Sequence, residues 1–253
     1  MTEITVVMPV FNSEKFLEAA VHSVLLQNFS DWELIIIDDR STDNSSQYIK
    51  SFSKEDSRIR YLRNKKRIGC VKSIEKSFKI AKGDYITFLD ADDLMSPKRI
   101  AEQLRFMKKN KLDLSYCDLE MFFENGDRVI KKSIDFSKKF KSIMKSFIGK
   151  KFDLQVPPGY HLGYQKHKRT IYRATFMFKK DILKKVKFDI NCKLMEENDL
   201  FFQAIAKNLR IKRFPKPYYQ YRRHEFQATK NLDAISKYEI YISKKLKSGA
   251  YFK

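Results

Sequence analysis

Five short apolar runs in the first half of the chain constrain its fold more than any other feature. Most are rich in Val, Ile, Leu and Phe, and they lie at residues 3–11, 32–38, 59–62, 85–89 and 113–117. A segment with apolar residues at helical spacing follows each of the first four runs. Strands without polar alternation, joined by helices, are typical of a parallel sheet buried on both faces. The chain is therefore predicted to be an α/β protein with a mostly parallel, Rossmann-like sheet flanked by helices.

The segments between these runs carry local signals that begin and end helices. Asn12 or Ser13 can cap the first helix, and residues 43–45 can open the second. Gly83 ends the third, and the pair at 96–97 places a capping serine before a proline at the start of the fourth. We therefore expect one helix after each of the first four strands.

The second half of the chain is less regular and predicts an extension of the same sheet. Asn125 and Gly126 form a dipeptide typical of a tight β-hairpin turn. Two further strands and one helix are expected, at residues 170–178, 210–214 and 199–207 respectively. With 253 residues, the chain suits one large domain with an extension. We expect a core at residues 1–117, a continuous second half at 118–225 and a basic C-terminal helix at 226–253.

The composition favours a protein with an anionic partner. Its 52 Lys and Arg against 31 Asp and Glu give a net charge of +21. This positive charge would attract nucleic acid, an anionic membrane surface or phosphorylated small molecules. No apolar run reaches the roughly 20 residues that span a bilayer, and the first residues lack a signal-peptide pattern, so we expect a cytoplasmic protein. Three widely spaced cysteines, Cys70, Cys117 and Cys192, are expected to be free, buried or half-buried thiols.

Acidic residues follow two of the predicted strands, at the sheet edge where ligands bind in such folds. Asp39 comes directly after the second strand, and Asp90, Asp92 and Asp93 come after the fourth. Three carboxylates this close repel one another, so the cluster favours binding of a hard divalent cation, Mg²⁺ or Mn²⁺. Such an ion is held by one or two carboxylates together with phosphate oxygens. A solvated acidic turn, with Asp93 or Ser96 capping the next helix, is the alternative.

Three segments at the strand ends, in this order and spacing, resemble a known enzyme family. They read VVMPVFN at residues 6–12, IIIDDRSTDNS at 35–45 and GDYITFLDADD at 83–93. The pattern returns in MEENDLFFQAI at 195–205 and in YYQYRRH at 218–224. Together these segments resemble the family 2 glycosyltransferases, which have the GT-A fold and use nucleotide-diphospho-sugars. The resemblance is strong over residues 3–112, and it implies that the second half forms the acceptor side.

The resemblance implies a nucleotide-binding set on the strand ends and in the segment before the fourth strand. Its members are Pro9, Phe11, Asp39, Lys72 and Asp90. A carboxylate such as Asp39 can accept a hydrogen bond from N3–H of uracil, so the base is expected to be uracil. Capping of the helix after Ser41 is the alternative role of Asp39. The basic position is Lys72, with Arg67 as the alternative, because family members often carry Arg-Asn where this chain has Lys72 and Ser73.

The resemblance also implies which residues contact the metal ion and the phosphates. Asp92 would bind Mn²⁺ or Mg²⁺ most directly, while Asp90 would reach the ribose or the metal. His224 can approach the metal or the diphosphate, and Arg222 and Arg223 can contact phosphates. Solvated surface side chains remain the alternative for these last three residues.

A carboxylate in the MEENDL segment is implied as the catalytic base. The family has an E-D-x-D-L type motif here, and this chain has Glu196, Glu197, Asn198, Asp199 and Leu200. We expect Glu197, which stands where the family usually has Asp, to take the proton of the acceptor hydroxyl, with Glu196 as the alternative. Attack opposite the leaving diphosphate would invert the anomeric configuration. An acidic first turn that only stabilises the helix dipole is the other possibility.

Two amphipathic segments predict contact with an anionic membrane surface. Residues 137–152 have apolar residues at helical spacing among lysines, with no intervening acid. A second apolar face near the C-terminus holds Ile235, Tyr238, Ile242 and Leu246. Ordinary surface helices packed on the core are the alternative. We expect binding to anionic vesicles that weakens with salt, as suits an enzyme peripheral to the inner face of a bacterial membrane.

The sequence as a whole predicts a metal-dependent, inverting hexosyltransferase that uses a UDP-sugar. The acceptor would be a saccharide or a lipid-linked saccharide in the synthesis of surface polysaccharide or lipooligosaccharide. A non-catalytic GT-A relative, favoured by Glu197 in place of Asp, is one alternative. A nucleotidyltransferase is another, although the first strand end lacks a Gly-rich phosphate loop. A nucleic-acid-binding protein is the third, but no nucleic-acid partner is expected because no RRM, KH, zinc-finger or helix-turn-helix pattern is present.

Overall fold

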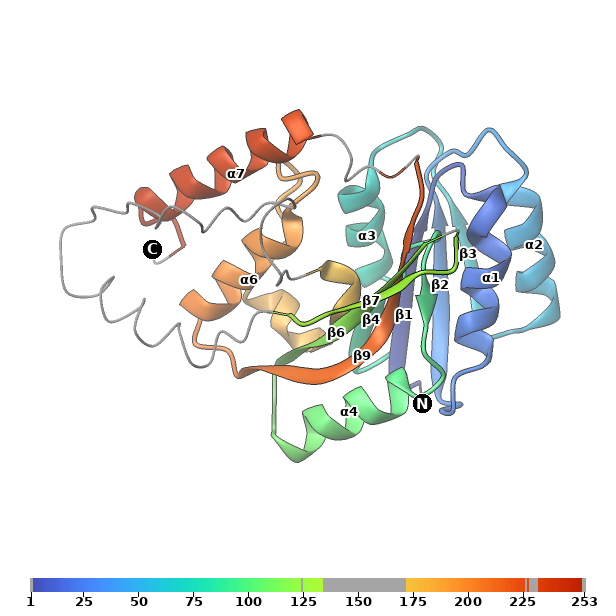
Figure 1. The fold of residues 1–253 in the computed structure, drawn as a ribbon, viewed down its shortest axis with the longest axis horizontal. Coiled ribbons are helices and arrows are strands. Elements are labelled where there is room, and N and C mark those ends of the chain that lie inside the picture. The colour runs from blue at the N-terminus through green and yellow to red at the C-terminus, as the bar shows by residue number, and fades with distance from the viewer. Residues whose placement is uncertain (1, 124, 134–171, 226, 228–231, 252–253) are drawn as a thin grey trace.

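The computed structural model describes residues 2–123, 125–133, 172–225, 227 and 232–251. Nine strands of this part form one sheet in the order β3-β2-β1-β4-β8-β6-β9-β5, with β7 paired to β6 (Figure 1). The strands are β1 (Ile4–Val10), β2 (Trp32–Asp38), β3 (Ile59–Arg63), β4 (Tyr85–Phe88), β5 (Leu94–Met95), β6 (Leu114–Phe123), β7 (Arg128–Lys131), β8 (Phe176–Lys179) and β9 (Ile211–Arg223). The helices are α1 (Glu14–Leu25), α2 (Ser45–Glu55), α3 (Cys70–Phe78), α4 (Arg99–Lys109), α6 (Glu196–Ala206) and α7 (Leu232–Lys247), with short 3₁₀ turns η1 (Arg173–Thr175) and η2 (Lys180–Lys184).

The first half of the sheet is parallel, and the second half makes it mixed. β1 pairs in parallel with β2 and β4, and β2 pairs in parallel with β3. β8 is antiparallel to both β4 and β6, while β9 runs parallel to β6 and antiparallel to β5. The predicted parallel sheet is therefore confirmed for β1 to β4. Val10 is in register with Asp38, and Asp38 with Arg63, so β1, β2 and β3 end at one edge.

Both faces of the sheet are covered by helices. Along β2, Leu34 and Ile36 pack with α1, α2 and α4, while Ile35 and Ile37 pack with α3 and α6. Successive side chains of a strand point to opposite faces, so a strand covered on both faces is apolar throughout. This is why the strands of the first half carry no polar alternation. A third cluster joins α6 to α7 at the opposite end of the molecule from α2 (Figure 1).

The four predicted helices are present, but their first residues are held differently from what the sequence indicates. Ser13 precedes α1, yet its hydroxyl donates to the carbonyl of Phe11 and does not cap the helix. The N–H of Glu14 instead donates to Asp43 Oδ2 at 3.0 Å, across from the loop before α2. α4 begins at Arg99, two residues later than expected. These helix starts depend on contacts between loops that are distant in sequence.

The second half differs more from the prediction. β6 runs to Phe123, across the expected join at 117–118, and turns at Asn125 and Gly126 into β7 as predicted, with φ of +91° at Gly126. The expectation of a strand over 170–178 is wrong in part, because η1 precedes β8. Thr175 N and Oγ1 both donate to the carbonyl of Tyr172, which closes a turn where an extended strand was expected.

The C-terminal helix α7 lies within the segment predicted to be helical. Its Ile242 and Leu246 are buried in the cluster with α6, so this apolar face contacts protein and the expectation that it faces a membrane is wrong for these two residues. Residues 137–152 lie outside the described part. None of the described helices is long and apolar enough to cross a membrane. The three cysteines are free, as predicted, with Cys117 and Cys192 buried.

Candidate active site

A cavity of about 370 Å³ opens where β1, β2 and β4 end. Seven of the predicted site residues line it: Pro9, Phe11, Asp39, Asp90, Asp92, Glu196 and Glu197. Four others do not line it: Lys72, Arg222, Arg223 and His224. The lining also includes residues outside the predicted set, among them Arg67, Tyr172, Arg173, Lys193, Tyr221 and Gln227. Folding therefore brings the strand-end acids and the MEENDL acids together on one cavity.

Asp39, at the end of β2, is buried and is held by the backbone before α3. Its Oδ1 accepts from Ile68 N at 2.8 Å, and its Oδ2 accepts from Gly69 N at 2.7 Å. Asp38, rather than Asp39, holds the start of the next loop, since its Oδ1 accepts from Ser41 N at 2.7 Å. Oδ2 of Asp39 makes one bond among the described residues, and a carboxylate oxygen can accept two. It can therefore accept a further N–H from a ligand in the cavity.

Arg67 is better placed than Lys72 to contact a ligand in the cavity. Cζ of Arg67 lies 3.8 Å from the centroid of the Phe11 ring, and both residues line the cavity. Lys72 lies in the first turn of α3, and its side chain is exposed. An aromatic face and a guanidinium beside the Asp39 carboxylate are suited to a base and a phosphate. The geometry favours the alternative, Arg67, over Lys72.

Arg173, a residue that was not predicted, links the DADD turn to α6. Its Nη2 pairs with Asp90 Oδ1, and its Nη1 lies 2.8 Å from Glu196 Oε1 and 3.1 Å from Cys70 Sγ. Arg173 is only 7% exposed, and its single positive charge is shared between the buried Glu196 and the half-buried Asp90. Burial raises the pKa of Asp90 and of Glu196, and the Arg173 charge opposes this rise. Burial also raises the pKa of the Cys70 thiol to about 11, so it stays protonated at neutral pH.

Glu197 differs from its neighbour Glu196 in forming no ion pair with the described residues. The Glu197 side chain is buried, lines the cavity and makes no hydrogen bond or ion pair to another of the described residues. Burial, followed by the Glu196 charge, raises the pKa of Glu197 well above its usual value. A carboxylate that binds protons more tightly than usual is suited to act as a general base near neutral pH. Of the two expected base candidates, the geometry favours Glu197.

Asp92 and His224 form the pair that best suits a metal ion. His224 Nε2 lies 3.0 Å from Asp92 Oδ2, and His224 Nδ1 is buried without a hydrogen-bond partner among the described residues. Across the described ranges, no group of three or more His, Cys, Asp or Glu is arranged to hold a metal. Mg²⁺ is commonly held by one or two carboxylates, with substrate phosphates and waters completing its shell. The pair fits a site of that open kind, which a diphosphate would complete.

Asp93 holds the DADD turn together and does not cap α4. Tyr219 Oη donates to Asp93 Oδ2 at 2.5 Å, and Arg222 N donates to Oδ1 at 2.8 Å. Burial, with the charges of Asp92 and Asp90, raises the pKa of Asp93 well above its usual value. The turn is therefore fixed by β9, a strand that begins more than 100 residues later in the chain.

Arg222 and Arg223 lie near this turn without lining the cavity. Arg222 Nε donates to the carbonyl of Asp92 at 2.8 Å, and its guanidinium lies 5.0 Å from the centroid of the Phe16 ring. The Arg223 guanidinium lies 5.9 Å from the centroid of the Tyr221 ring. Arg222 thus supports the backbone of the DADD turn, in place of the phosphate contact expected for it.

A comparison with known protein families identifies the family of this chain. A family model described as "Glycosyl transferase family 2" matches residues 5–185, more than half of the chain. The chain belongs to glycosyl transferase family 2. The resemblance seen in the strand-end motifs is thereby confirmed.

Relatives of this family 2 glycosyltransferase carry the same activity in their names. An uncharacterized glycosyltransferase of Methanocaldococcus jannaschii is 31% identical over 211 residues, which cover 82% of this chain and 66% of the relative. The UDP-Glc:alpha-D-GlcNAc-diphosphoundecaprenol beta-1,3-glucosyltransferase WfgD of Escherichia coli is 33% identical over 142 residues, 55% of each chain. The match thus spans between half and two thirds of the length of these relatives.

Solved structures confirm the GT-A fold of this glycosyltransferase. Staphylococcus aureus TarS 1–349 in complex with UDP-GlcNAc superposes with a TM-score of 0.67 at 20% identity, covering 91% of this chain and 61% of TarS. The mannosyltransferase PcManGT of Pyrobaculum calidifontis, in complex with GDP-Man and Mn²⁺, gives a TM-score of 0.59 at 13% identity, covering 86% and 56%. At these identities the likeness concerns the fold.

Arg173 is the site residue of this glycosyltransferase that sequence reasoning missed most clearly. The segment TIYRATFMF was interpreted as a strand, in which a single Arg would point to solvent. The one available signal was that arginine itself, a charged residue inside an otherwise apolar run. Because buried charges are paired, an Arg in such a run indicates acidic partners elsewhere in the fold.

Proposed function

We propose that this chain is a metal-dependent, inverting glycosyltransferase that moves a sugar from a UDP-sugar to a saccharide or lipid-linked saccharide hydroxyl. The observation that carries the proposal is the composition of one cavity. Glu197, buried and without an ion pair to the described residues, shares it with Asp92, whose carboxylate is paired with His224, and with Asp39 and Phe11. A base, an open cation site and a place for a nucleotide are thus near one another.

The residues divide into three roles in the proposed reaction. Asp39 accepts N3–H of uracil, Phe11 contacts the face of the base, and Arg67 contacts the diphosphate. Asp92 and His224 would hold Mn²⁺ or Mg²⁺, which when bound supplies positive charge to the departing diphosphate. Arg173 keeps Asp90 and Glu196 in place through one ion pair with each.

Glu197 takes the proton in the proposed transfer. The acceptor oxygen forms a bond to C1 of the sugar as its proton passes to the Glu197 carboxylate. The bond between C1 and the diphosphate oxygen breaks, and UDP leaves with both electrons of that bond. A single displacement from the face opposite the diphosphate inverts the configuration at C1. The raised pKa of Glu197 makes it a stronger base than an ordinary carboxylate.

The comparisons support the choice of donor and acceptor class. WfgD is named for a UDP-glucose donor and a diphosphoundecaprenol-linked acceptor, and TarS has been solved with UDP and with UDP-GlcNAc. A net charge of +21 is consistent with an acceptor held at an anionic membrane surface. We therefore propose peripheral membrane contact together with a lipid-linked acceptor. Binding to anionic vesicles that is lost at high salt supports this part, and equal recovery with neutral vesicles contradicts it.

Calorimetric titration with UDP tests the nucleotide and metal parts together. Wild type is expected to bind UDP in Mn²⁺ and to bind it more weakly in EDTA. Asp92→Ala is expected to lose the metal-dependent part, whereas Asp181→Ala, at an exposed position, is expected to match wild type. Absence of UDP binding in both conditions would remove uridine from the proposal. Binding without turnover of any UDP-sugar would indicate the non-catalytic relative instead.

A further inference from the structure

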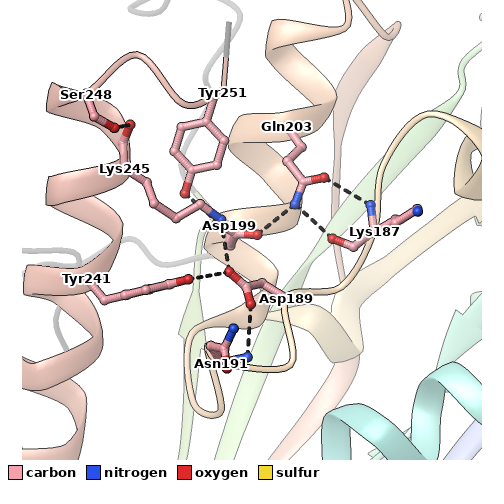
Figure 2. Close-up of polar contacts among 9 residues, drawn as sticks. All are labelled: Lys187, Asp189, Asn191, Asp199, Gln203, Tyr241, Lys245, Ser248 and Tyr251. Atoms are coloured by element: carbon pink, nitrogen blue, oxygen red, sulfur yellow. Dashed lines mark hydrogen bonds and ion pairs between the residues drawn. The ribbon is translucent and has the colours of Figure 1, made fainter. Parts of the chain in front are cut away.

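The C-terminal helix α7 contacts the helix that carries Glu197 through buried polar groups (Figure 2). Asp199 lies in the first turn of α6, two residues after Glu197, and is 0% exposed. Lys245 Nζ pairs with Asp199 Oδ1, and Tyr251 Oη donates to the same oxygen at 2.6 Å. Both donors belong to the C-terminal part of the chain. The turn that presents Glu197 to the cavity is therefore tied to α7.

Lys245 also holds the loop that precedes α6. Its Nζ lies 3.1 Å from Asp189 Oδ2, and the loop that follows Asp189 lines the cavity through Lys193 and Leu194. Burial works against the charge of Lys245, but the Asp199 and Asp189 carboxylates outweigh it and raise the pKa of the lysine. The amine thus stays charged between two carboxylates, one on the loop and one on the helix (Figure 2).

Apolar packing surrounds this pair of ion contacts. Ile242 and Leu246 of α7 are buried against Cys192 and Met195, the residue directly before Glu196. A buried carboxylate that loses its cation is costly, because neither water nor another charge replaces the partner. Gln203 of α6 donates to Asp199 Oδ2 at 2.7 Å but is neutral, so Lys245 is the cation of the described residues that compensates the Asp199 charge and ties the first turn of α6 to α7.

We infer that Lys245 and Tyr251 are positioning residues for the transfer reaction, because they hold Asp199 and thereby the turn that aims Glu197 into the cavity. The inference rests on the proposed role of Glu197 as the base. Neither residue lines the cavity, so both act through Asp199. The residues proposed to hold the nucleotide lie directly after β1, directly after β2 and before α3. Release of α7 is therefore expected to lower kcat and to leave UDP binding unchanged.

Five substitutions on the C-terminal segment separate positioning from general packing. Lys245→Met keeps most of the side-chain volume and removes the charge, and Tyr251→Phe removes only the hydroxyl that donates to Asp199. Lys244→Met, on the exposed face of α7, is the matched control for the lysine. Tyr238→Phe is the matched control for the tyrosine, because Tyr238 packs on the same cluster without a hydroxyl bond among the described residues. Lys245→Arg tests whether a different cationic side chain at this position preserves kcat.

The measurements are kcat, the Kd of UDP in Mn²⁺ by calorimetry, and amide hydrogen exchange over residues 195–203. Since a small misplacement of a catalytic group costs on the order of 100-fold in rate, Lys245→Met is expected to lower kcat by roughly 10- to 100-fold, with Tyr251→Phe losing less. UDP affinity is expected to stay within about twofold of wild type, a change near 0.4 kcal/mol. Exchange over 195–203 is expected to rise in both variants and not in the two controls, and Lys245→Arg is expected to recover part of kcat.

Two results would overturn the inference. One is an unchanged kcat and unchanged exchange over 195–203 in Lys245→Met. The other is a parallel loss of UDP affinity and kcat, which would show that α7 stabilises the whole domain. Wild type that binds UDP without turning over any UDP-sugar would instead overturn the proposed function. In that case the exchange of residues 195–203 alone decides whether α7 orders this turn.

Discussion

The two sides of the cavity hold their carboxylates by different means. On the nucleotide side, Asp39 accepts hydrogen bonds from the backbone N–H groups of Ile68 and Gly69 and from Asn64 Nδ2, and it forms no ion pair with the described residues. On the base side, the acids of the first turn of α6 depend on single cations from elsewhere in the chain. Arg173 is paired with Glu196 and Lys245 with Asp199, while Glu197 has no cation among the described residues.

This difference predicts that the two sides respond differently to substitution. A backbone N–H remains when a side chain is changed, so the Asp39 site is robust to most single substitutions around it. A buried ion pair is lost when one side chain is removed, and the remaining charge is left without compensation. The base side is therefore expected to concentrate both stability and catalysis in a few side chains.

The largest expected effect is that of Glu197→Gln on turnover. A general base contributes about 10²- to 10⁴-fold in rate, so kcat is expected to fall by that order while UDP binding persists. The measurement is turnover of the donor found by screening UDP-sugars, alongside calorimetry with UDP. Turnover close to wild type in Glu197→Gln would show that another residue of the cavity is the base.

The next effect is that of Arg173→Met on stability. Its loss leaves the buried Glu196 and the half-buried Asp90 without their cation, and breaking a buried pair such as Arg173–Glu196 destabilises by about 3–5 kcal/mol. Urea denaturation measures the free energy of unfolding. Arg210→Met is the matched control, because Arg210 pairs with Asp113 at the surface, where such a pair contributes little. Equal stability of the two variants would show that Arg173 does not hold the base side.

A smaller effect distinguishes two cations on the nucleotide side. Arg67→Ala is expected to weaken UDP binding by about tenfold, because a charge-assisted contact contributes roughly 1.5 kcal/mol. Lys72→Ala is expected to match wild type, since its side chain is exposed and lies outside the cavity lining. The Kd of UDP in Mn²⁺ measures both. A larger loss of UDP affinity in Lys72→Ala than in Arg67→Ala would restore Lys72 as the nucleotide-binding residue.

The smallest expected effect is that of Glu196→Gln, which is expected to shift the pH dependence of activity more than it changes the maximal rate. Burial and the Glu196 charge raise the pKa of Glu197, and a base acts only when ionised, so activity rises with pH through that pKa. Removing the Glu196 charge lowers the pKa of Glu197, which moves the acidic limb of kcat/KM to lower pH. Arg173, no longer paired with a Glu196 carboxylate, also lowers the pKa of Glu197. A limb that moves to higher pH, or stays in place, would show that another group controls the profile.

The first half of the fold and the nucleotide side were readable from the sequence because they follow from residue patterns within single segments. Continuous apolar strands predicted a sheet covered on both faces, and the acids at consecutive strand ends predicted one ligand edge. Pro9, Phe11, Asp39, Asp90 and Asp92 all line the cavity for this reason. The bond from Arg222 to the carbonyl of Asp92 was not predicted, because the two residues are 130 positions apart in the sequence.

The sequence by itself determined the parallel α/β core, the family and the acidic turns at the strand ends. These follow from periodicity and from residue types at fixed positions along neighbouring strands. Only the tertiary structure decided that Arg173 pairs with Asp90 and Glu196, that Glu197 lacks a cation among the described residues, and that Lys245 is paired with Asp199. The physical reason is that a buried charge must find its partner in space, and no local pattern states which distant residue will supply it.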